Sequence, residues 1–478
     1  MIDHSLYETP FSSRYASNEM SYLFSPHFKY TTWRKLWVAL AKAQKELGIP
    51  ITDKQIKELE GQVENVDFHL AAEYEKKFRH DVMAHLYAYG EQCPEAKPFI
   101  HLGATSCYVT DNGDLIQMRE GLKILRAKLI QIIRQLADFA SKYSSLATLS
   151  FTHFQPAQPT TVGKRACLWI QDCLMDLKDL EIRLDNIHFL GVKGATGTQA
   201  SFVSLFDHDH GKVKQLEILV AKEMGFQNLF KISGQTYTRK QDMRIFSVLN
   251  GIAATAHKFG SDLRLLAHLK ELEEPFEEKQ IGSSAMPYKR NPVRAERICG
   301  LSRFLISLNE NPSYTAANQW LERSLDDSSN RRLALSEGFL CADSILNLLC
   351  DITSGIVVNP KIISKHLDEE IPFLATENIL MHAVKTGKDR QEIHEKLRKH
   401  SLEAAKKIKE EGQPGDLLRR ISEDPSLGLS AADLADIIKL EYFTGMSAEQ
   451  THDFLNQEVN PILTQYKDIK PYIPSISV

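Results

Sequence analysis

Residues 115–139, LIQMREGLKILRAKLIQIIRQLADF, carry the strongest indication of the fold class. Its apolar residues recur in alternating steps of three and four, at Leu115, Met118, Leu122, Leu125, Leu129, Ile132, Leu136 and Phe139. This spacing places them in one stripe along a helix, and a stripe sustained over several heptads is typical of long helices that pack nearly parallel. The sequence therefore predicts a long core helix in this region.

Residues 166–187 and 245–266 repeat the pattern, and further helical patterns follow Pro292 and run from 330 to 353. We therefore predict a mostly α protein with a bundle of long helices, whose surplus apolar faces pack against other subunits. Three helical domains are expected: an N-terminal cap (1–105), a central long-helix bundle that forms a shared oligomer core (106–358), and a C-terminal domain (359–478), broken near residues 412–415. Strand signals are few and short, as at residues 147–151 and 189–192.

The composition limits the possible functions of this chain of 478 residues. With 58 basic and 62 acidic residues the net charge is -4, which gives no support for nucleic-acid or membrane binding. The seven cysteines form no CxxC pair, which favours reduced thiols in a cytoplasmic protein. Residues 1–5 lack the features of a secretory signal, and no uncharged apolar stretch reaches membrane-spanning length. We expect a cytoplasmic protein without nucleic-acid or membrane partners.

Residues 282–292, GSSAMPYKRNP, combine hydroxyls with positive charges. We expect a loop that leads into a helix, with Asn291 as N-cap and Pro292 as the first helical residue. The helix N-terminus, Lys289 and Arg290 would create a positive field in which Ser283 loses its proton more easily. Considered alone, such a run is more often a surface turn.

Two further segments carry small hydroxyls or a histidine next to a predicted helix. Residues 103–112, GATSCYVTDN, offer Thr105 and Ser106 for binding a carboxylate, with Asp111 as the expected N-cap of a helix that begins near Leu115. Residues 152–161, THFQPAQPTT, place His153 in a segment stiffened by two prolines. Each segment considered singly is more often an ordinary helix cap or an unremarkable histidine.

Together and in this order, the three segments resemble the signature of the fumarase/aspartase superfamily. Over essentially the whole chain, the similarity is greatest to those members that act on a purine nucleotide succinylated on its base. Arg323, Ser328 and Arg332 would suit a phosphate monoester, which fumarate, malate and aspartate lack. Two arginines would also repel the guanidinium of argininosuccinate.

The resemblance implies a role for each matching position. Ser283 would be the general base and His153 the general acid, while Lys289, Thr105 and Ser106 would hold the doubly negative intermediate. His80 would be a second catalytic-site histidine. The expected substrate-binding residues are Arg14, Tyr15, Arg79, His80, Asp81, Thr105, Ser106, Gln235, Arg297, Arg323, Ser328 and Arg332.

The implied reaction is release of fumarate from adenylosuccinate to give AMP, and from the succinylated aminoimidazole carboxamide ribotide of purine synthesis. The resemblance also implies a homotetramer with sites shared between subunits, and no metal or organic cofactor.

Two alternatives stay open: another fumarate-releasing lyase, such as one that cleaves argininosuccinate, and a catalytically silent structural protein on the same fold. The run Asp207-His208-Asp209-His210 has metal-ligand composition, but its four residues are consecutive, so we do not expect a metal site. The basic cluster Lys289, Arg290, Arg294 and Arg297 lacks interleaved aromatic residues, which disfavours nucleic-acid binding.

Overall fold

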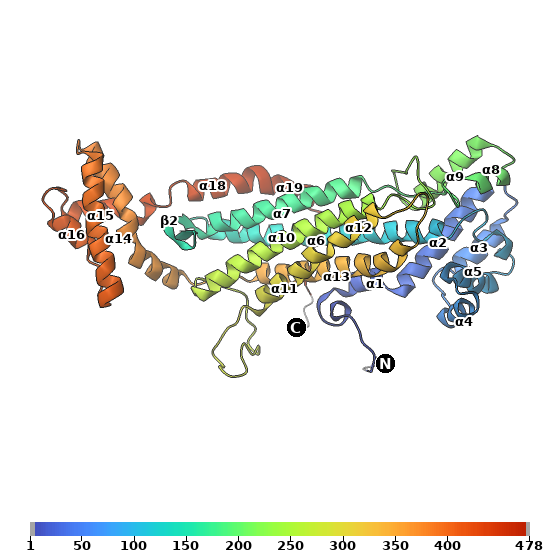
Figure 1. The fold of residues 1–478 in the computed structure, drawn as a ribbon, viewed down its shortest axis with the longest axis horizontal. Helices are drawn as coiled ribbons and strands as arrows, with labels where there is room; N and C mark the ends of the chain where they lie inside the picture. The colour runs from blue at the N-terminus through green and yellow to red at the C-terminus, as the bar shows by residue number, and fades with distance from the viewer. Residues whose placement is uncertain (1–4, 475–478) are drawn as a thin grey trace.

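Five long helices run along the length of the molecule and form its central bundle (Figure 1). They are α6 (Cys107–Lys142), α7 (Val162–Asp185), α10 (Lys240–His268), α11 (Val293–Leu308) and α13 (Asp326–Ser354), and the short α12 (Glu310–Ala317) follows α11. The computed structural model describes residues 5–474, so residues 1–4, on which the expectation about a secretory signal partly rests, lie outside the described part. The mostly helical fold is confirmed.

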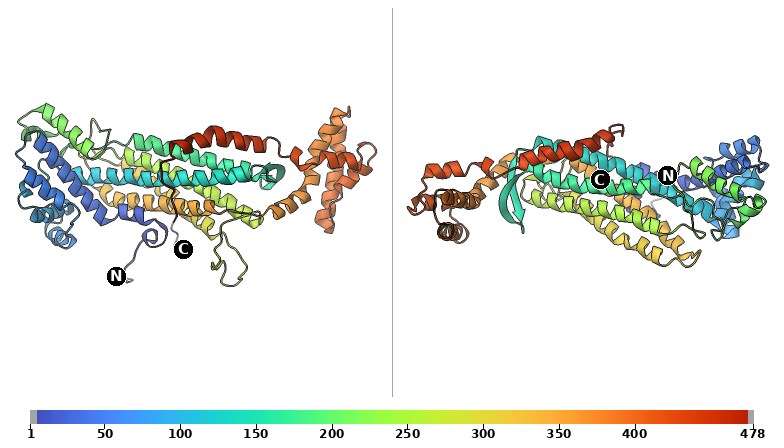
Figure 2. Two further views of the ribbon diagram at one scale, coloured as in Figure 1. Left: turned by 180° about the vertical axis from the view of Figure 1, so that it is seen from behind. Right: turned by 90° about the horizontal axis from the view of Figure 1, so that it is seen from above.

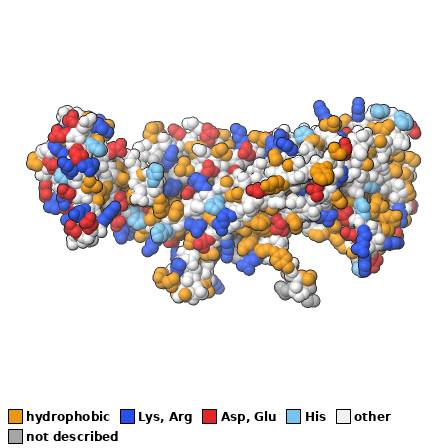
Figure 3. All heavy atoms as spheres, in the orientation of Figure 1, with side chains coloured by type: hydrophobic (Ala, Val, Ile, Leu, Met, Phe, Trp, Pro, Cys, Tyr) orange, Lys and Arg blue, Asp and Glu red, His pale blue; other side chains and the backbone are white. Residues whose placement is uncertain are grey.

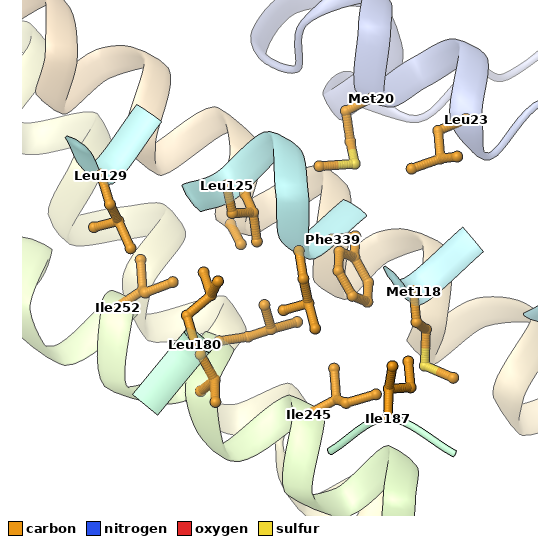
Figure 4. Packing of buried hydrophobic residues seen from close by; sticks show 14 of the residues in the cluster. Met20, Leu23, Met118, Leu125, Leu129, Leu180, Ile187, Ile245, Ile252 and Phe339 are labelled. Atoms are coloured by element: carbon orange, nitrogen blue, oxygen red, sulfur yellow. The ribbon is translucent and has the colours of Figure 1, made fainter. Parts of the chain in front are cut away.

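The predicted apolar stripe of α6 is the centre of the bundle. Leu115, Met118, Leu122 and Leu125 are fully buried. Figure 4 shows Met118, Leu125 and Leu129 facing side chains from the N-terminal helices, α7, α10 and α13. Gly121 has no side chain because a Cβ there would lie 2.6 Å from the ring of Phe339 on α13. The heptad pattern therefore identified a true packing seam.

Helix α6 begins at Cys107, earlier than the sequence predicted, and Asp111 does not cap it. The Asp111 carboxylate is buried and accepts hydrogen bonds from Arg239 Nη1 at 2.9 Å and Nη2 at 3.2 Å. Its charge is therefore neutralised by an arginine 128 positions later in the chain, which local sequence did not reveal.

Shorter helices form the N-terminal end of the molecule. In chain order the elements are the π-helix η1 (Phe11–Tyr15), α1 (Asn18–Leu23), α2 (Pro26–Glu46), α3 (Asp53–Gly61), α4 (Phe68–Phe78), α5 (Asp81–Gln92) and the 3₁₀ helix η2 (Lys97–Phe99). Helix α2 starts where Ser25 accepts a hydrogen bond from the Phe28 amide at 3.2 Å, with Pro26 in its first turn. Two helices from the bundle domain, α8 (Ala200–Leu205) and α9 (His210–Glu223), lie at the same end (Figure 1).

The C-terminal helices form a separate group at the opposite end (Figure 1). They are α14 (Pro360–Lys385), α15 (Arg390–Glu411), α16 (Leu417–Glu423) and α17 (Ala431–Ile437), followed by the 3₁₀ helix η3 (Leu440–Tyr442). These helices share an apolar cluster of their own, with members from Ala375 to Phe443. Gly412, with φ of 63°, is the C-cap of α15. The chain then returns along the bundle through α18 (Ser447–Phe454), the π-helix η4 (Leu455–Val459) and α19 (Asn460–Gln465), and Val459 joins the main core. The division at residues 105 and 358 stays a prediction.

Strands are few in the described part of the chain. Strands β1 (Ala147–Thr152) and β2 (Gln155–Thr161) form an antiparallel hairpin, and β3 (Leu272–Glu273) pairs with β4 (Val357–Val358). Figure 2 shows the hairpin standing off the end of the bundle, near the C-terminal helices. The strand predicted at 189–192 is wrong: only an isolated bridge joins Phe189 to Leu229, because that segment has no continuous partner strand.

Among the described residues, α13 alone is long and apolar enough to cross a membrane by length and composition. However, 83 % of its most apolar window is buried inside the protein, as expected of a core helix. All seven cysteines are buried and free.

Candidate active site

A cavity of about 790 Å³ lies where the N-termini of α5, α6 and α13 meet. Three helix N-termini aimed at one space supply unpaired amide donors and partial positive charge, which suits an anionic ligand. Most of the predicted substrate-binding residues line this cavity: Arg79, His80, Asp81, Thr105, Ser106, Gln235, Arg323, Ser328 and Arg332. The structure therefore brings together residues from four separate parts of the sequence.

His80 is the N-cap of α5. Its Nδ1 accepts a long hydrogen bond from the Met83 amide at 3.4 Å, so in the neutral ring the proton is on Nε2. His80 Nε2 is 3.4 Å from Ser106 Oγ, which joins the first turn of α5 to the start of α6. The preceding residue, Arg79, has φ of 56° and ends α4, so the chain turns sharply here and directs both side chains to the cavity.

A buried network of ion pairs forms the floor of the cavity. Arg239, which is 1 % exposed, binds Asp111 at 2.9 Å and Asp327 at 2.7 Å. Asp327 also accepts a hydrogen bond from Arg323 at 2.7 Å. Burial acts to raise the pKa of Asp327, but Arg239 and Arg323 hold it below its ordinary value. Arg323 is therefore fixed at the cavity wall by a carboxylate that is itself fixed by Arg239.

Arg331 and Arg332 both line the cavity but differ in burial and in their partners. Arg331 is buried and binds Asp114 at 2.9 Å and Asp242 at 2.8 Å. The Arg332 side chain is 58 % exposed and binds Asp81 at 2.8 Å across the cavity wall. Burial acts to raise the pKa of Asp81, but the hydrogen bond from Arg332 holds it below its usual range. Of the two, only Arg332 presents an open guanidinium edge to a ligand.

Lys29 lines the same cavity and was not predicted. Its Nζ is 5.2 Å from the ring centroid of Trp33 and 5.5 Å from that of Tyr30, and none of the ion pairs of residues 5–474 involves it. Burial lowers the pKa of Lys29. No sequence signal marks this lysine, because it lies on α2, far from every motif, and only the packing of α2 beside α6 brings it to the cavity.

Ser283 and Lys289 lie in a long loop between β3 and α11 that projects from the bundle (Figure 1). Ser283 Oγ accepts hydrogen bonds from the amides of Ala285 at 3.3 Å and Met286 at 3.1 Å. Two amide donors favour a negatively charged oxygen. A Cβ at Gly282 would lie 2.1 Å from the Lys289 carbonyl oxygen, so this close approach requires glycine.

The predicted N-cap at Asn291 is wrong. Helix α11 begins at Val293, and Asn291 Nδ2 donates to the Gly282 carbonyl oxygen at 2.7 Å, which closes the neck of the loop. The buried carboxylate of Glu274 accepts from the amides of Arg294 at 3.1 Å and Ala295 at 3.0 Å instead. The start of α11 is thus fixed by a residue some twenty positions earlier in the sequence.

His153 occupies the tip of the β1–β2 hairpin, outside the cavity. His153 and Phe154 form the two-residue turn between Thr152 and Gln155, with φ of 53° and 58°. Such a turn prefers asparagine and glycine, and strained backbone at non-glycine residues clusters at functional sites. An exposed histidine held in a strained turn fits a functional role better than a structural one.

The other predicted residues lie elsewhere on the chain. Arg14 and Tyr15 lie in η1, on a segment that projects from the same side of the bundle as the Ser283 loop (Figure 1). Arg297 is on α11. Within one chain, therefore, Arg14, Tyr15, His153, Ser283, Lys289 and Arg297 do not line the cavity.

The run Asp207–His210 has a structural explanation. Asp209 caps α9 by accepting a hydrogen bond from the Lys212 amide at 3.0 Å. Across residues 5–474, no group of three or more metal-ligating side chains gathers in one place.

Comparison with known proteins places these features in a family. A lyase family model matches residues 28–305, and a model of the adenylosuccinate lyase C-terminus matches residues 372–454. The chain is 50 % identical to an adenylosuccinate lyase of Schizosaccharomyces pombe over 98 % of both chains, and 50 % identical to one of Schistosoma mansoni over 97 % of both. Identity to the Saccharomyces cerevisiae enzyme of the same name is 48 %, over 98 % of both.

Solved structures show the same fold at low sequence identity. A 3-carboxy-cis,cis-muconate lactonizing enzyme from Pseudomonas putida superposes with a TM-score of 0.81 at 21 % identity, covering 96 % of this chain and 99 % of that one. A fumarate lyase from Mesorhizobium sp. BNC1 gives 0.80 at 20 % identity, covering 95 % and 100 %. At these identities the likeness establishes the fold alone.

Proposed function

The chain belongs to the adenylosuccinate lyase family, and from this membership we propose that it removes fumarate from adenylosuccinate by β-elimination and releases AMP. The cavity at three helix N-termini is the observation that carries the proposal. Arg79, Arg323, Arg332 and Lys29 bring positive charge to it, which suits a ligand with a phosphate and two carboxylates. The analogous cleavage of the succinylated aminoimidazole carboxamide ribotide is part of the proposal.

Each step is assigned to a side chain. Ser283 takes a proton from the succinyl carbon beside a carboxylate, and the electron pair spreads into that carboxylate. The two amides on Ser283 Oγ support its role as a base. The C–N bond then breaks, fumarate leaves, and His153 donates a proton to the purine nitrogen.

Lys289, Thr105 and Ser106 hold the doubly negative intermediate. Thr105 and Ser106 directly precede α6, where the positive end of the helix reinforces their hydrogen bonds. Lys289 is exposed on its loop. These steps use only side chains, so we propose that neither a metal nor an organic cofactor takes part.

We also propose that a complete site needs several chains. In one chain the hairpin that carries His153 and the cavity lie at opposite ends of the bundle, with the Ser283 loop between them (Figure 1). On α7, Leu168, Met175 and Ile182 recur every seventh residue and are 50, 62 and 41 % exposed. Figure 3 shows further hydrophobic side chains along the long body. A homotetramer with three chains per site would bury such stripes and bring the three regions together.

Ultraviolet absorbance tests the proposed reaction directly. Purified protein is incubated separately with adenylosuccinate, the succinylated ribotide and argininosuccinate. We expect turnover of the first two and none of the third. Turnover of argininosuccinate alone would assign a different lyase activity, and no turnover of any substrate by folded protein would favour a structural role. A cytoplasmic location stays a prediction, which imaging of the tagged chain in its own cell would test.

A further inference from the structure

A second cavity, of about 230 Å³, lies between the C-terminal end of α7 and the N-terminal end of α10. Three cationic side chains line it, Arg183, Lys240 and Arg244, together with the imidazole of His188. No aspartate or glutamate is among its lining residues. The concentration of positive charge is notable because the chain as a whole has a net charge of -4.

The cations of this cavity have no carboxylate partners. None of the ion pairs found among residues 5–474 includes Arg183, Lys240 or Arg244, although most arginines of the bundle interior are paired. Like charges gathered without counter-ions repel one another, and an anion between them removes that repulsion. The N-terminus of the 29-residue helix α10 adds partial positive charge on the same side.

The walls of the cavity are held in place without a ligand. The His188 amide donates to Gln241 Oε1 at 2.9 Å, and Gln241 Nε2 donates to the His188 carbonyl oxygen at 3.0 Å. This pair of hydrogen bonds fastens the segment after α7 to the first turn of α10. The ring of Phe230 packs against His188, with 5.2 Å between the ring centroids. The site is thus pre-organised, which lowers the entropy cost of binding.

We propose that this cavity is a phosphate-binding site distinct from the substrate cavity. Its volume is below that of pockets for drug-sized ligands, which start at about 300 Å³, so it takes a small oxyanion rather than a whole nucleotide. Arginine forks and a helix N-terminus match phosphate in shape and charge. The ligand is therefore inorganic phosphate or the phosphoryl group of a small phosphate ester.

The position of the site connects it with the substrate cavity. Thr238 and Lys240 line the second cavity, while Arg239, between them, lines the first and binds Asp111 and Asp327 beneath it. Phe230 is also stacked on Tyr237, with an interplanar angle of 5°. A bound anion would therefore contact the segment that fixes the floor of the substrate cavity, which makes this a regulatory position.

The test measures phosphate binding while AMP fills the substrate cavity. The full-length protein is saturated with AMP, and inorganic phosphate is titrated at constant ionic strength, balanced with chloride, by calorimetry and by thermal melting. We expect saturable binding of one phosphate per chain. The double variant Lys240→Gln/Arg244→Gln should bind at least about tenfold more weakly, because it lacks two charge-assisted contacts.

A matched control removes the same amount of charge outside both cavities, from the two helices that flank the second cavity. Lys178 on α7 and Arg264 on α10 are exposed, and Lys178→Gln/Arg264→Gln should bind phosphate like the wild type. Repeating the titration with ribose 5-phosphate separates the two sources: binding of the ester shows that a phosphoryl group is enough, and its failure assigns the site to free phosphate. Absence of phosphate binding to AMP-saturated wild type, or equal binding by both double variants, would overturn the proposal.

Discussion

Arg331 and Arg332 are neighbours on α13, yet their side chains have opposite roles, and substitution should separate them. Arg332→Ala should weaken AMP binding about tenfold or more, since a charge-assisted bond to phosphate contributes roughly 1.5–3 kcal/mol, and should affect fumarate less. Arg331→Ala leaves Asp114 and Asp242 without their buried partner, which should cost about 3–5 kcal/mol of stability.

Calorimetric titration with AMP and with fumarate, together with thermal melting, checks both variants. Arg332→Ala should melt like the wild type, whereas Arg331→Ala should melt at a clearly lower temperature. If Arg332→Ala loses affinity for AMP and fumarate equally, Arg332 does not bind the phosphate.

Ser283 and Ser284 offer a matched pair for testing the proposed base. Ser283→Ala should lower turnover at least ~10²-fold, the low end for loss of a general base, without changing the melting temperature. Ser284 is adjacent and more exposed, and Ser284→Ala is the control that keeps the loop composition. Near-normal turnover by folded Ser283→Ala would remove Ser283 from the mechanism.

The pH dependence of the rate tests His153. A general acid must be protonated to act, so the basic limb of a bell-shaped profile of kcat/KM should disappear in His153→Ala, along with most of the activity. Residual turnover in the variant can be followed with concentrated enzyme. A basic limb that survives unchanged would mean that another group is the acid.

Most of the predicted substrate-binding residues line the cavity, but the sequence did not show how they are held there. Nine of the predicted residues meet there because the loop motifs lie at helix ends, a position that motif and helix pattern predict together. Lys29, Arg239 and Asp327 were missed because their roles depend on contacts between segments far apart in the sequence. Local patterns carry no information about such partners.

The presence of the long helices could be predicted from the sequence, but the residues at which α6 and α11 begin could not. The stripes of α6, α7 and α10 follow from periodicity alone, since burial of one face needs apolar residues at regular intervals. The N-terminus of α11 was misplaced because its amides are bound by Glu274, a residue from the other end of the loop. The prediction of Asp111 as an N-cap was wrong for the same reason. Asp111 lies within α6, where its carboxylate is bound by Arg239.

The N-terminal helices should be sensitive to acid. Burial, assisted by Arg34, lowers the pKa of His85 on α5 to about 4, and burial, assisted by His80, lowers that of His101 to about 4. Both are therefore neutral in the folded protein, while an unfolded chain protonates them near pH 6.5. The free energy of unfolding should therefore be unaffected by these histidines above pH 6.5. It should fall as the pH drops from 6.5 towards 4, by up to about 3 kcal/mol for the buried His85.

Thermal melting at pH 7 and pH 5 checks this expectation. His85→Gln should show a smaller drop in melting temperature between the two pH values than the wild type, because it has no proton to gain. His69→Gln is the control, since the His69 side chain is 88 % exposed. An unchanged pH dependence in His85→Gln would show that other groups cause the acid sensitivity.

The whole molecule is an elongated bundle with its proposed catalytic parts spread along its length (Figures 1 and 2). The long apolar stripes predicted the bundle, which the structure confirms, and the packing of its surplus faces against other subunits, which stays a prediction. They could not predict which ends of which helices meet, because that depends on how chains associate rather than on any one chain. The separation of the His153 hairpin from the cavity is what makes the shared site testable.

Hybrid tetramers provide that test. His153→Ala and Ser283→Ala proteins, each inactive alone, are mixed, dissociated and allowed to reassemble. If one site takes His153 and Ser283 from different chains, some hybrid sites receive both wild-type residues, so part of the activity should return. Native mass spectrometry confirms that hybrids have formed, and a mixture kept assembled throughout is the control. Hybrids without any recovered activity would mean that both residues reach the site from the same chain, which the opposite placement of hairpin and cavity in this fold argues against.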